Sequence, residues 1–71
     1  MHRFPSIERF VFEHGWIEVG RDDFSTSFIR ASDIGGMIWE GKDDYDSLDA
    51  AFADLELALT SWLAANFGRN P

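Results

Sequence analysis

The chain has 71 residues and no cysteine, which limits it to a single domain with one apolar core and excludes disulfides, thiolate metal sites and cysteine nucleophiles. Thirteen acidic and six basic side chains give a net charge of −7, so we expect no direct binding to nucleic acid and none to anionic membranes. No apolar run reaches membrane-spanning length and no signal peptide is visible, so we expect a cytoplasmic protein without a cofactor.

Residues 6–14 are predicted to form a short amphipathic helix. Ser6 can cap its start, Gly15 can close its end, and its apolar side chains recur at steps of three and four residues (Ile7, Phe10, Val11 and His14). The alternative is a strand, because residues 10–12 are good strand formers. The spacing and both end signals favour the helix.

Three strands are predicted over residues 16–20, 24–31 and 37–41, joined by turns at 20–23 and 32–36. Because side chains alternate between the two faces of a strand, one face would carry Ile17, Val19, Phe28, Met37 and Trp39. The other face would carry Trp16, Glu18, Ser25, Ser27, Ile29, Ile38 and Glu40. Turns this short favour an antiparallel meander.

A long helix is predicted over residues 46–68. Ser47 is a suitable N-cap, Gly68 stands where a glycine ends a helix, and one side carries Leu48, Phe52, Leu55, Leu59, Trp62 and Phe67. The opposite side, expected to face water, carries Asp49, Asp54, Glu56, Thr60 and Ser61. The fold class is therefore α+β in the order α-β-β-β-α, a single domain over residues 1–71 with both helices packed on one face of the sheet.

This order and length resemble the double-stranded-RNA-binding-domain fold. That family places lysines at the start of its last helix, whereas residues 42–56 read KDDYDSLDAAFADLE here. RNA binding is therefore not carried over by the resemblance.

Several turns and helix signals also resemble the N-terminal domain of HicB-type antitoxins over about residues 16–65. They are the strand Phe28–Ala31, the turn Asp33–Gly36, the strand Met37–Gly41, the helix start Ser47–Ala51 and the segment Ala58–Leu63. The resemblance implies contact with a toxin protein. It does not imply autoregulation by DNA binding, because no DNA-binding segment follows Pro71, and the loop before the helix is longer than in that family. The patterns Gly15–Glu18 and Trp39–Lys42 further resemble small uncharacterised bacterial proteins, which imply no function.

Most of the net negative charge lies between residues 40 and 56, where seven acidic side chains accompany Lys42 alone. One interpretation is a docking face for a basic protein partner, formed by Asp43, Asp44, Asp46 and Asp49. The other is a solvated surface that keeps an aromatic-rich domain soluble. A calcium site of the EF-hand type is not supported, because the loop places Leu48 at a ligand position and lacks the central glycine.

Catalytic residue types are present but not in a catalytic arrangement. His14, a serine at 25 or 27 and an aspartate at 22 or 23 could form a triad, yet nothing in their spacing indicates a nucleophile turn or an oxyanion hole. We therefore expect neither an enzyme nor a metal site.

The sheet face away from the helices is the stronger candidate for function. Its apolar side chains are fringed by polar groups, a composition typical of interfaces, and the candidate interface comprises Trp16, Glu18, Ile29, Ile38 and Glu40. The alternative is that its aromatic side chains cover one another. The sequence thus predicts a non-enzymatic, acidic protein–protein interaction module that could homodimerise. An acidic mimic of nucleic acid, bound by a basic nucleic-acid-binding protein, is the alternative.

Overall fold

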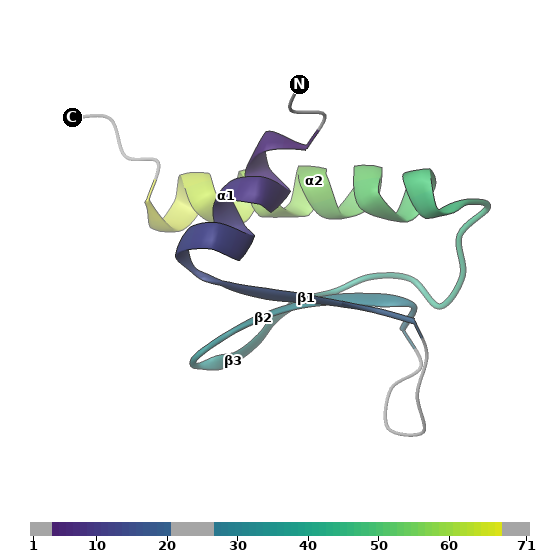
Figure 1. Cartoon of the computed structure of the whole chain (residues 1–71), viewed down its shortest axis with the longest axis horizontal. Helices are drawn as coiled ribbons and strands as arrows, with labels where there is room; N and C mark the ends of the chain where they lie inside the picture. Colours follow the sequence, from purple (N-terminus) through teal and green to yellow (C-terminus); the bar gives the residue numbers. More distant parts are fainter. Residues whose placement is uncertain (1–3, 21–26, 68–71) are drawn as a thin grey trace.

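The computed structural model describes residues 4–20 and 27–67 and has two layers (Figure 1). Both helices lie on one face of a three-stranded antiparallel sheet whose strand order is β1-β2-β3. The elements are α1 (Pro5–Glu13), β1 (Gly15–Val19), β2 (Ile29–Asp33), β3 (Gly36–Glu40) and α2 (Leu48–Asn66). The predicted α+β class and the α-β-β-β-α order are confirmed.

Helix α2 forms as its sequence predicts. The hydroxyl oxygen of Ser47 accepts a hydrogen bond from the backbone N–H of Ala50 at 3.0 Å, which satisfies one of the free donors of the first turn. The buried side is formed by Ala51, Leu55, Leu59 and Leu63, spaced by four residues each. The predicted closing residue, Gly68, lies outside the described residues.

Helix α1 is capped by a different residue from the one expected. Phe4 is the N-cap and makes no side-chain capping bond, while Pro5 occupies the first turn. The two carboxylate oxygens of Glu56, on α2, each accept a backbone N–H at 2.9 Å, one from Ser6 and one from Ile7. The expectation that Glu56 faces water was therefore wrong, because its charge satisfies the positive end of the neighbouring helix.

Gly15 directly follows the C-cap residue His14, which is the predicted closing position of α1, and it is also the first residue of β1. A side chain at Gly15 would meet the carbonyl oxygen of Ser32 and, at 2.8 Å, the ring of Phe10. The glycine therefore permits the close approach of the first helix to the sheet.

Strand β2 is shifted relative to its prediction, which spanned residues 24–31. It runs from Ile29 to Asp33, and Ile29 and Ala31 are fully buried beneath the helices. The placement of Ile29 on the open face was wrong because the following turn is shorter than predicted. In that turn the carboxylate of Asp33 accepts the N–H of Gly35 at 2.8 Å, and Gly36 adopts a φ of 123°. The predicted turn at 20–23, apart from Gly20, and strand residues 24–26 lie outside the described residues.

Strand β3 departs from regular alternation at a bulge. Trp39 pairs with Ala31 and Met37 pairs with Ser32, so Ile38 is the extra residue between them. As a result both Ile38 and Trp39 pack against the core, whereas Met37 is 54% exposed. The prediction that Met37 faces the helices and Ile38 the open side was wrong for this reason.

The core lies between the helices and the covered face of the sheet. Its fully buried members come from both helices and from β2, and they are Phe10, Ile29, Ala31, Ala51, Leu55 and Leu59. Half-buried aromatic side chains close its sides, including Phe28, Trp39, Phe52 and Trp62. Four residues expected in the core are instead exposed, and they are Val11, Val19, Met37 and Leu48.

Candidate functional site

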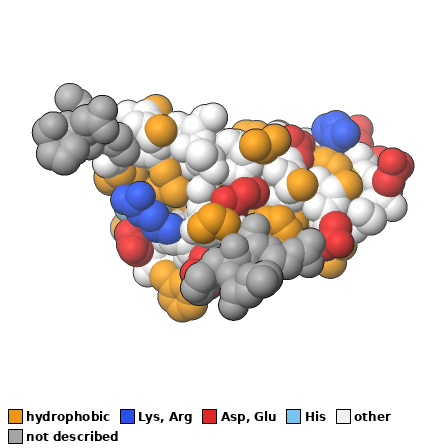
Figure 2. Space-filling view, turned by 90° about the horizontal axis from the view of Figure 1, so that it is seen from above, with side chains coloured by type: hydrophobic (Ala, Val, Ile, Leu, Met, Phe, Trp, Pro, Cys, Tyr) orange, Lys and Arg blue, Asp and Glu red, His pale blue; other side chains and the backbone are white. Residues whose placement is uncertain are grey.

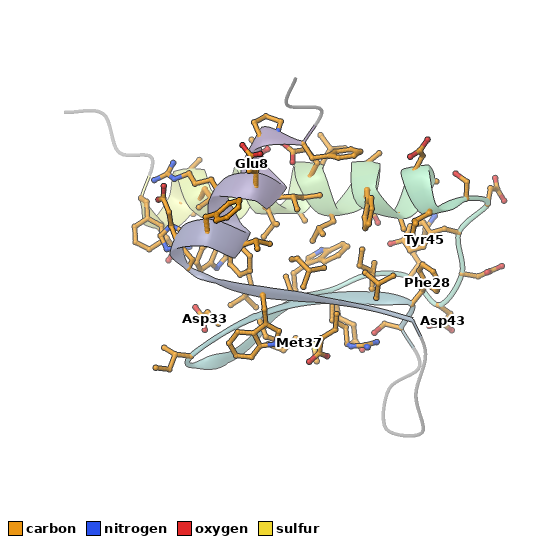
Figure 3. The ribbon with its side chains drawn as sticks, viewed as in Figure 1. Glu8, Phe28, Asp33, Met37, Asp43 and Tyr45 are labelled. Carbon is orange, nitrogen blue, oxygen red and sulfur yellow. The ribbon has the colours of Figure 1, made fainter. Side chains whose placement is uncertain are left out.

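The sheet face away from the helices is a mixed apolar and charged surface. The strand register places Trp16 beside Ser32 and Ser32 beside Met37, so the two apolar side chains flank a small central residue. Figure 3 shows Met37 on the side of the sheet opposite the helices. Trp16 is 48% exposed, Met37 54%, and Ile34, in the turn beside them, 100%. We call Trp16, Ile34 and Met37 the hairpin patch.

Arg30 organises the other half of this face. Its side chain is buried, and its Nε donates to Glu18 at 3.1 Å across the β1–β2 pair. Its two terminal nitrogens donate to the carbonyl oxygens of Ser27, at 2.7 Å, and Gly20, at 3.1 Å. These bonds satisfy the guanidinium and hold the loop ends that flank β1 and β2.

The network extends to both edges of the sheet. The buried hydroxyl of Ser27 donates to Glu40 on β3 at 2.7 Å, and the indole N–H of Trp16 donates to Glu18 at 3.4 Å. The polar part of the open face is therefore built of interlocking hydrogen bonds. The sequence predicts polar groups around this face but not the buried Arg30 that connects them.

The structure brings together only part of the predicted interface. Trp16, Glu18 and Glu40 lie on the open face, whereas Ile29 is in the core and Ile38 packs against it. Sequence reasoning missed Arg30, Ile34 and Met37. A two-residue turn at Ile34-Gly35 would have revealed Arg30, because it moves the phase of β2 by one residue. Met37 is exposed because of the bulge at Ile38, for which the sequence carries no comparable signal.

The predicted acidic docking residues gather at one end of the molecule. Asp43, Asp44, Asp46 and Asp49 are all exposed, in the loop before α2 and in its first turn. In Figure 2 acidic side chains cluster at the end where α2 begins. Among the described residues no three histidine, aspartate or glutamate side chains are arranged to hold a metal ion.

Tyr45 anchors this acidic loop. Its hydroxyl donates to Asp54 at 2.7 Å and accepts the backbone N–H of Lys42 at 2.9 Å, and its ring lies beside Phe28 (Figure 3). Burial, followed by the hydrogen bond to the Asp54 carboxylate, raises the pKa of Tyr45 above its usual value of 10.0. A side chain at Gly41 would meet this hydroxyl at 2.5 Å, so the tight loop needs its glycine.

The residue types of a catalytic triad are not brought together in the described part of the chain. His14 lies among aromatic rings, stacked on Phe67 at 4.3 Å between centroids, at the end of β1 where Gly15 pairs with Asp33. Ser27 lies near the other end of that strand pair and is bonded to Glu40. The remaining candidates at 22, 23 and 25 fall outside the described residues.

A shallow groove of about 350 Å³ runs between α1 and α2, lined by Pro5, Ser6, Arg9, Thr60, Leu63 and Ala64. Its hydroxyls are bonded to each other, since Ser6 and Thr60 lie 2.7 Å apart, and Arg9 pairs with Glu13 on its own helix. The groove therefore contains no arrangement of acid, base and nucleophile.

Comparison with known proteins does not extend these observations. The chain matches no protein-family model, no curated protein and no solved structure. Over the part of the chain that the structure describes, no helix combines the length and apolar character needed to cross a membrane. The resemblances noted from sequence remain predictions.

Proposed function

We propose that the chain is a non-enzymatic protein–protein interaction module that binds a protein partner through the hairpin patch. The observation that carries this proposal is the exposure of Trp16 on β1, of Met37 on β3 and of Ile34 in the turn between β2 and β3, with Ser32 of β2 between Trp16 and Met37. Large apolar side chains that adjoin one another on a surface are typical of interfaces, and tryptophan and methionine are enriched there.

The hydrogen-bonded network beside the patch supports the same proposal. Arg30 and its partners Glu18 and Ser27 occupy fixed positions before any partner arrives. A preorganised polar rim beside an apolar centre lowers the entropy that binding must overcome, and it adds specificity. An antitoxin-like module, whose partner is a small toxin protein, is the specific form of this proposal that the HicB resemblance suggests.

The proposal is tested by affinity capture from the native host at high salt, with matched variants. We expect Met37→Asp to lose the partner that the unmodified chain retains, because an unpaired carboxylate would be buried in an apolar contact. With the purified partner, the dissociation constant should rise about tenfold or more. Leu57→Asp, on the outer side of α2 where Leu57 is 71% exposed, is the matched control and should bind normally.

A partner that bound Met37→Asp as tightly as the unmodified chain would show that the hairpin patch is not the binding surface. Circular dichroism of each variant separates lost binding from lost folding. Ile38, which packs against the core, is unsuitable for this test because a charge there would disturb the fold.

The acidic-mimic alternative is favoured by a different observation, the exposed Asp43, Asp44, Asp46 and Asp49. In that case the partner is a basic protein, and its binding weakens steeply with salt. A partner recovered only at low salt and lost by the double variant Asp43→Asn/Asp44→Asn would support the mimic. The Met37→Asp variant would then bind normally, so the two proposals give opposite results.

A further inference from the structure

The two edge strands of the sheet, β1 and β3, differ in how well they are protected against pairing with a strand of another chain. Strand β3 carries the bulge at Ile38, a feature that disrupts pairing with another chain. Strand β1, the opposite edge, pairs with β2 in continuous register over all its residues and contains no proline, lysine or bulge. Among the described strands, β1 is therefore the edge without the usual protection against strand addition.

The backbone N–H and C=O groups of β1 point alternately toward β2 and toward the free edge of the sheet. The N–H of Gly20 donates to the carbonyl of Phe28 at 2.6 Å, so Gly20 faces β2. Because this direction alternates along a strand, Glu18 and Trp16 also face β2. The residues between them, Gly15, Ile17 and Val19, therefore direct their N–H and C=O groups to the free edge.

The side chains of β1 allow a neighbour at this edge. Glu18 is its one charged residue, and its carboxylate accepts from Arg30 across the sheet at 3.1 Å. Trp16 and Val19 are about half exposed, at 48% and 47%, and lie on opposite faces of the strand. Apolar surface is thus available on both sides of the free edge.

We propose that β1 pairs antiparallel with β1 of a second copy of the chain, with Ile17 on the two-fold axis. In this register Gly15 lies opposite Val19 of the second copy, and Trp16 lies opposite Glu18 of the second copy. This register pairs every residue of β1 and never sets a glutamate against a glutamate. A register centred on Glu18 would place two like charges directly opposite each other, which is destabilising.

The dimer has one six-stranded sheet whose helices all lie on the same side. The interface is isologous, as two-fold symmetry requires. The hairpin patches of both copies then share one continuous open face. The pairing itself does not require the proposed partner, because its hydrogen bonds come from the backbone of β1. Trp16 belongs both to the hairpin patch and to the seam between the copies, whereas Ile34 and Met37 lie outside the seam.

The first test is sedimentation equilibrium of the whole chain and two variants at Val19. The unmodified chain should dimerise with a concentration-dependent average mass. Val19→Pro removes an edge-facing N–H without removing a bond to β2, because that N–H does not face β2, and prolines are tolerated there on edge strands. It should raise the dimer dissociation constant about thirtyfold, since each copy loses a backbone hydrogen bond. Val19→Thr keeps the N–H and the branched shape, and should dimerise normally.

The second test reads the register by cross-linking. The chain contains no cysteine, so each introduced thiol is unique. A mixture of Trp16→Cys and Glu18→Cys chains should form a mixed disulfide on oxidation, because these positions face each other as a non-hydrogen-bonded pair with closely spaced side chains. Each variant alone should cross-link poorly.

Three results of these experiments would contradict the proposed dimer or its register. A monomer at all concentrations, or equal dimerisation of Val19→Pro and Val19→Thr, would overturn pairing at β1. A dimer in which Trp16→Cys cross-links with itself better than with Glu18→Cys would overturn the proposed register. Because neither test involves a partner protein, their failure is distinguishable from failure of the proposed function.

Discussion

The two faces of the sheet exclude water by different means. On the covered face, Ile29 and Ala31 are fully buried against Phe10, Leu55 and Leu59 of the helices. On the open face, Arg30 is also buried, yet it is held by hydrogen bonds to Glu18, Ser27 and Gly20. Neighbours in one strand are thus buried by apolar packing on one side and by a polar network on the other.

This difference assigns separate roles to the two faces. Apolar burial is the main source of folding free energy, so the covered face should determine stability. A hydrogen-bonded ion pair adds less net stability but fixes side-chain positions. The open face, with its exposed Trp16 and Met37, should therefore determine recognition.

The largest expected effect is on the covered face. Ile29→Ala should lower the free energy of unfolding by about 3–4 kcal/mol, because it removes buried methyl groups and leaves a cavity. Met37→Ala, on the open face, should change it by about 0.5 kcal/mol or less. Urea titrations followed by circular dichroism measure both. Equal losses would show that the two faces of the sheet have been assigned incorrectly.

The next effect concerns the spacing between α1 and the covered face. Gly15→Ala should destabilise the fold by about 2–3 kcal/mol, because the added methyl group meets the Ser32 carbonyl and the Phe10 ring. Gly35→Ala is the matched control, since its nearest new neighbour is an Asp33 carboxylate oxygen at 3.4 Å. In thermal melting, Gly15→Ala should therefore have a clearly lower melting temperature than Gly35→Ala. A tolerated Gly15→Ala would contradict the close approach of helix and sheet.

A smaller effect is expected from the polar network on the open face. Arg30→Met should cost about 2 kcal/mol, because several buried acceptors lose a charged donor. Arg9→Met removes an exposed pair with Glu13 one helical turn away, and should cost about 0.5 kcal/mol or less. Guanidinium titrations at constant pH compare the two. If Arg30→Met and Arg9→Met lowered the free energy of unfolding by the same amount, the hydrogen bonds of Arg30 would stabilise the fold no more than an exposed ion pair does.

The smallest effect lies at the end of the sheet, where Tyr45 bonds Asp54. Tyr45→Phe should lower stability by about 1 kcal/mol at neutral pH through the lost hydrogen bonds. The folded state raises the pKa of Tyr45, so it holds the phenol proton more tightly than the unfolded state. This contribution is complete below about pH 10, and it is lost as pH rises through the higher pKa of the folded state. The unmodified chain should therefore lose more stability above pH 10 than Tyr45→Phe. If the unmodified chain and Tyr45→Phe lost stability to the same extent above pH 10, the raised pKa of Tyr45 would be contradicted.

Much of the fold was predictable because its signals are local. Helix α2 follows from a long apolar period and from Ser47 at its start, and the antiparallel pairing of β2 with β3 follows from the short turn between them. The interface was predicted less well. Trp16, Glu18 and Glu40 were placed on the open face correctly, but Ile29 and Ile38 were not.

The sequence by itself determined the type and order of the helices and strands, since capping and periodicity act over a few residues. The tertiary structure decided which side of β2 and β3 faces the core, because the segment around Ile29 alternates acceptably in either phase. It also decided the bulge at Ile38 and the capping of α1 by Glu56, 49 and 50 residues away from its partners in the chain. Those features depend on contacts between distant residues, which form only when the two layers pack together.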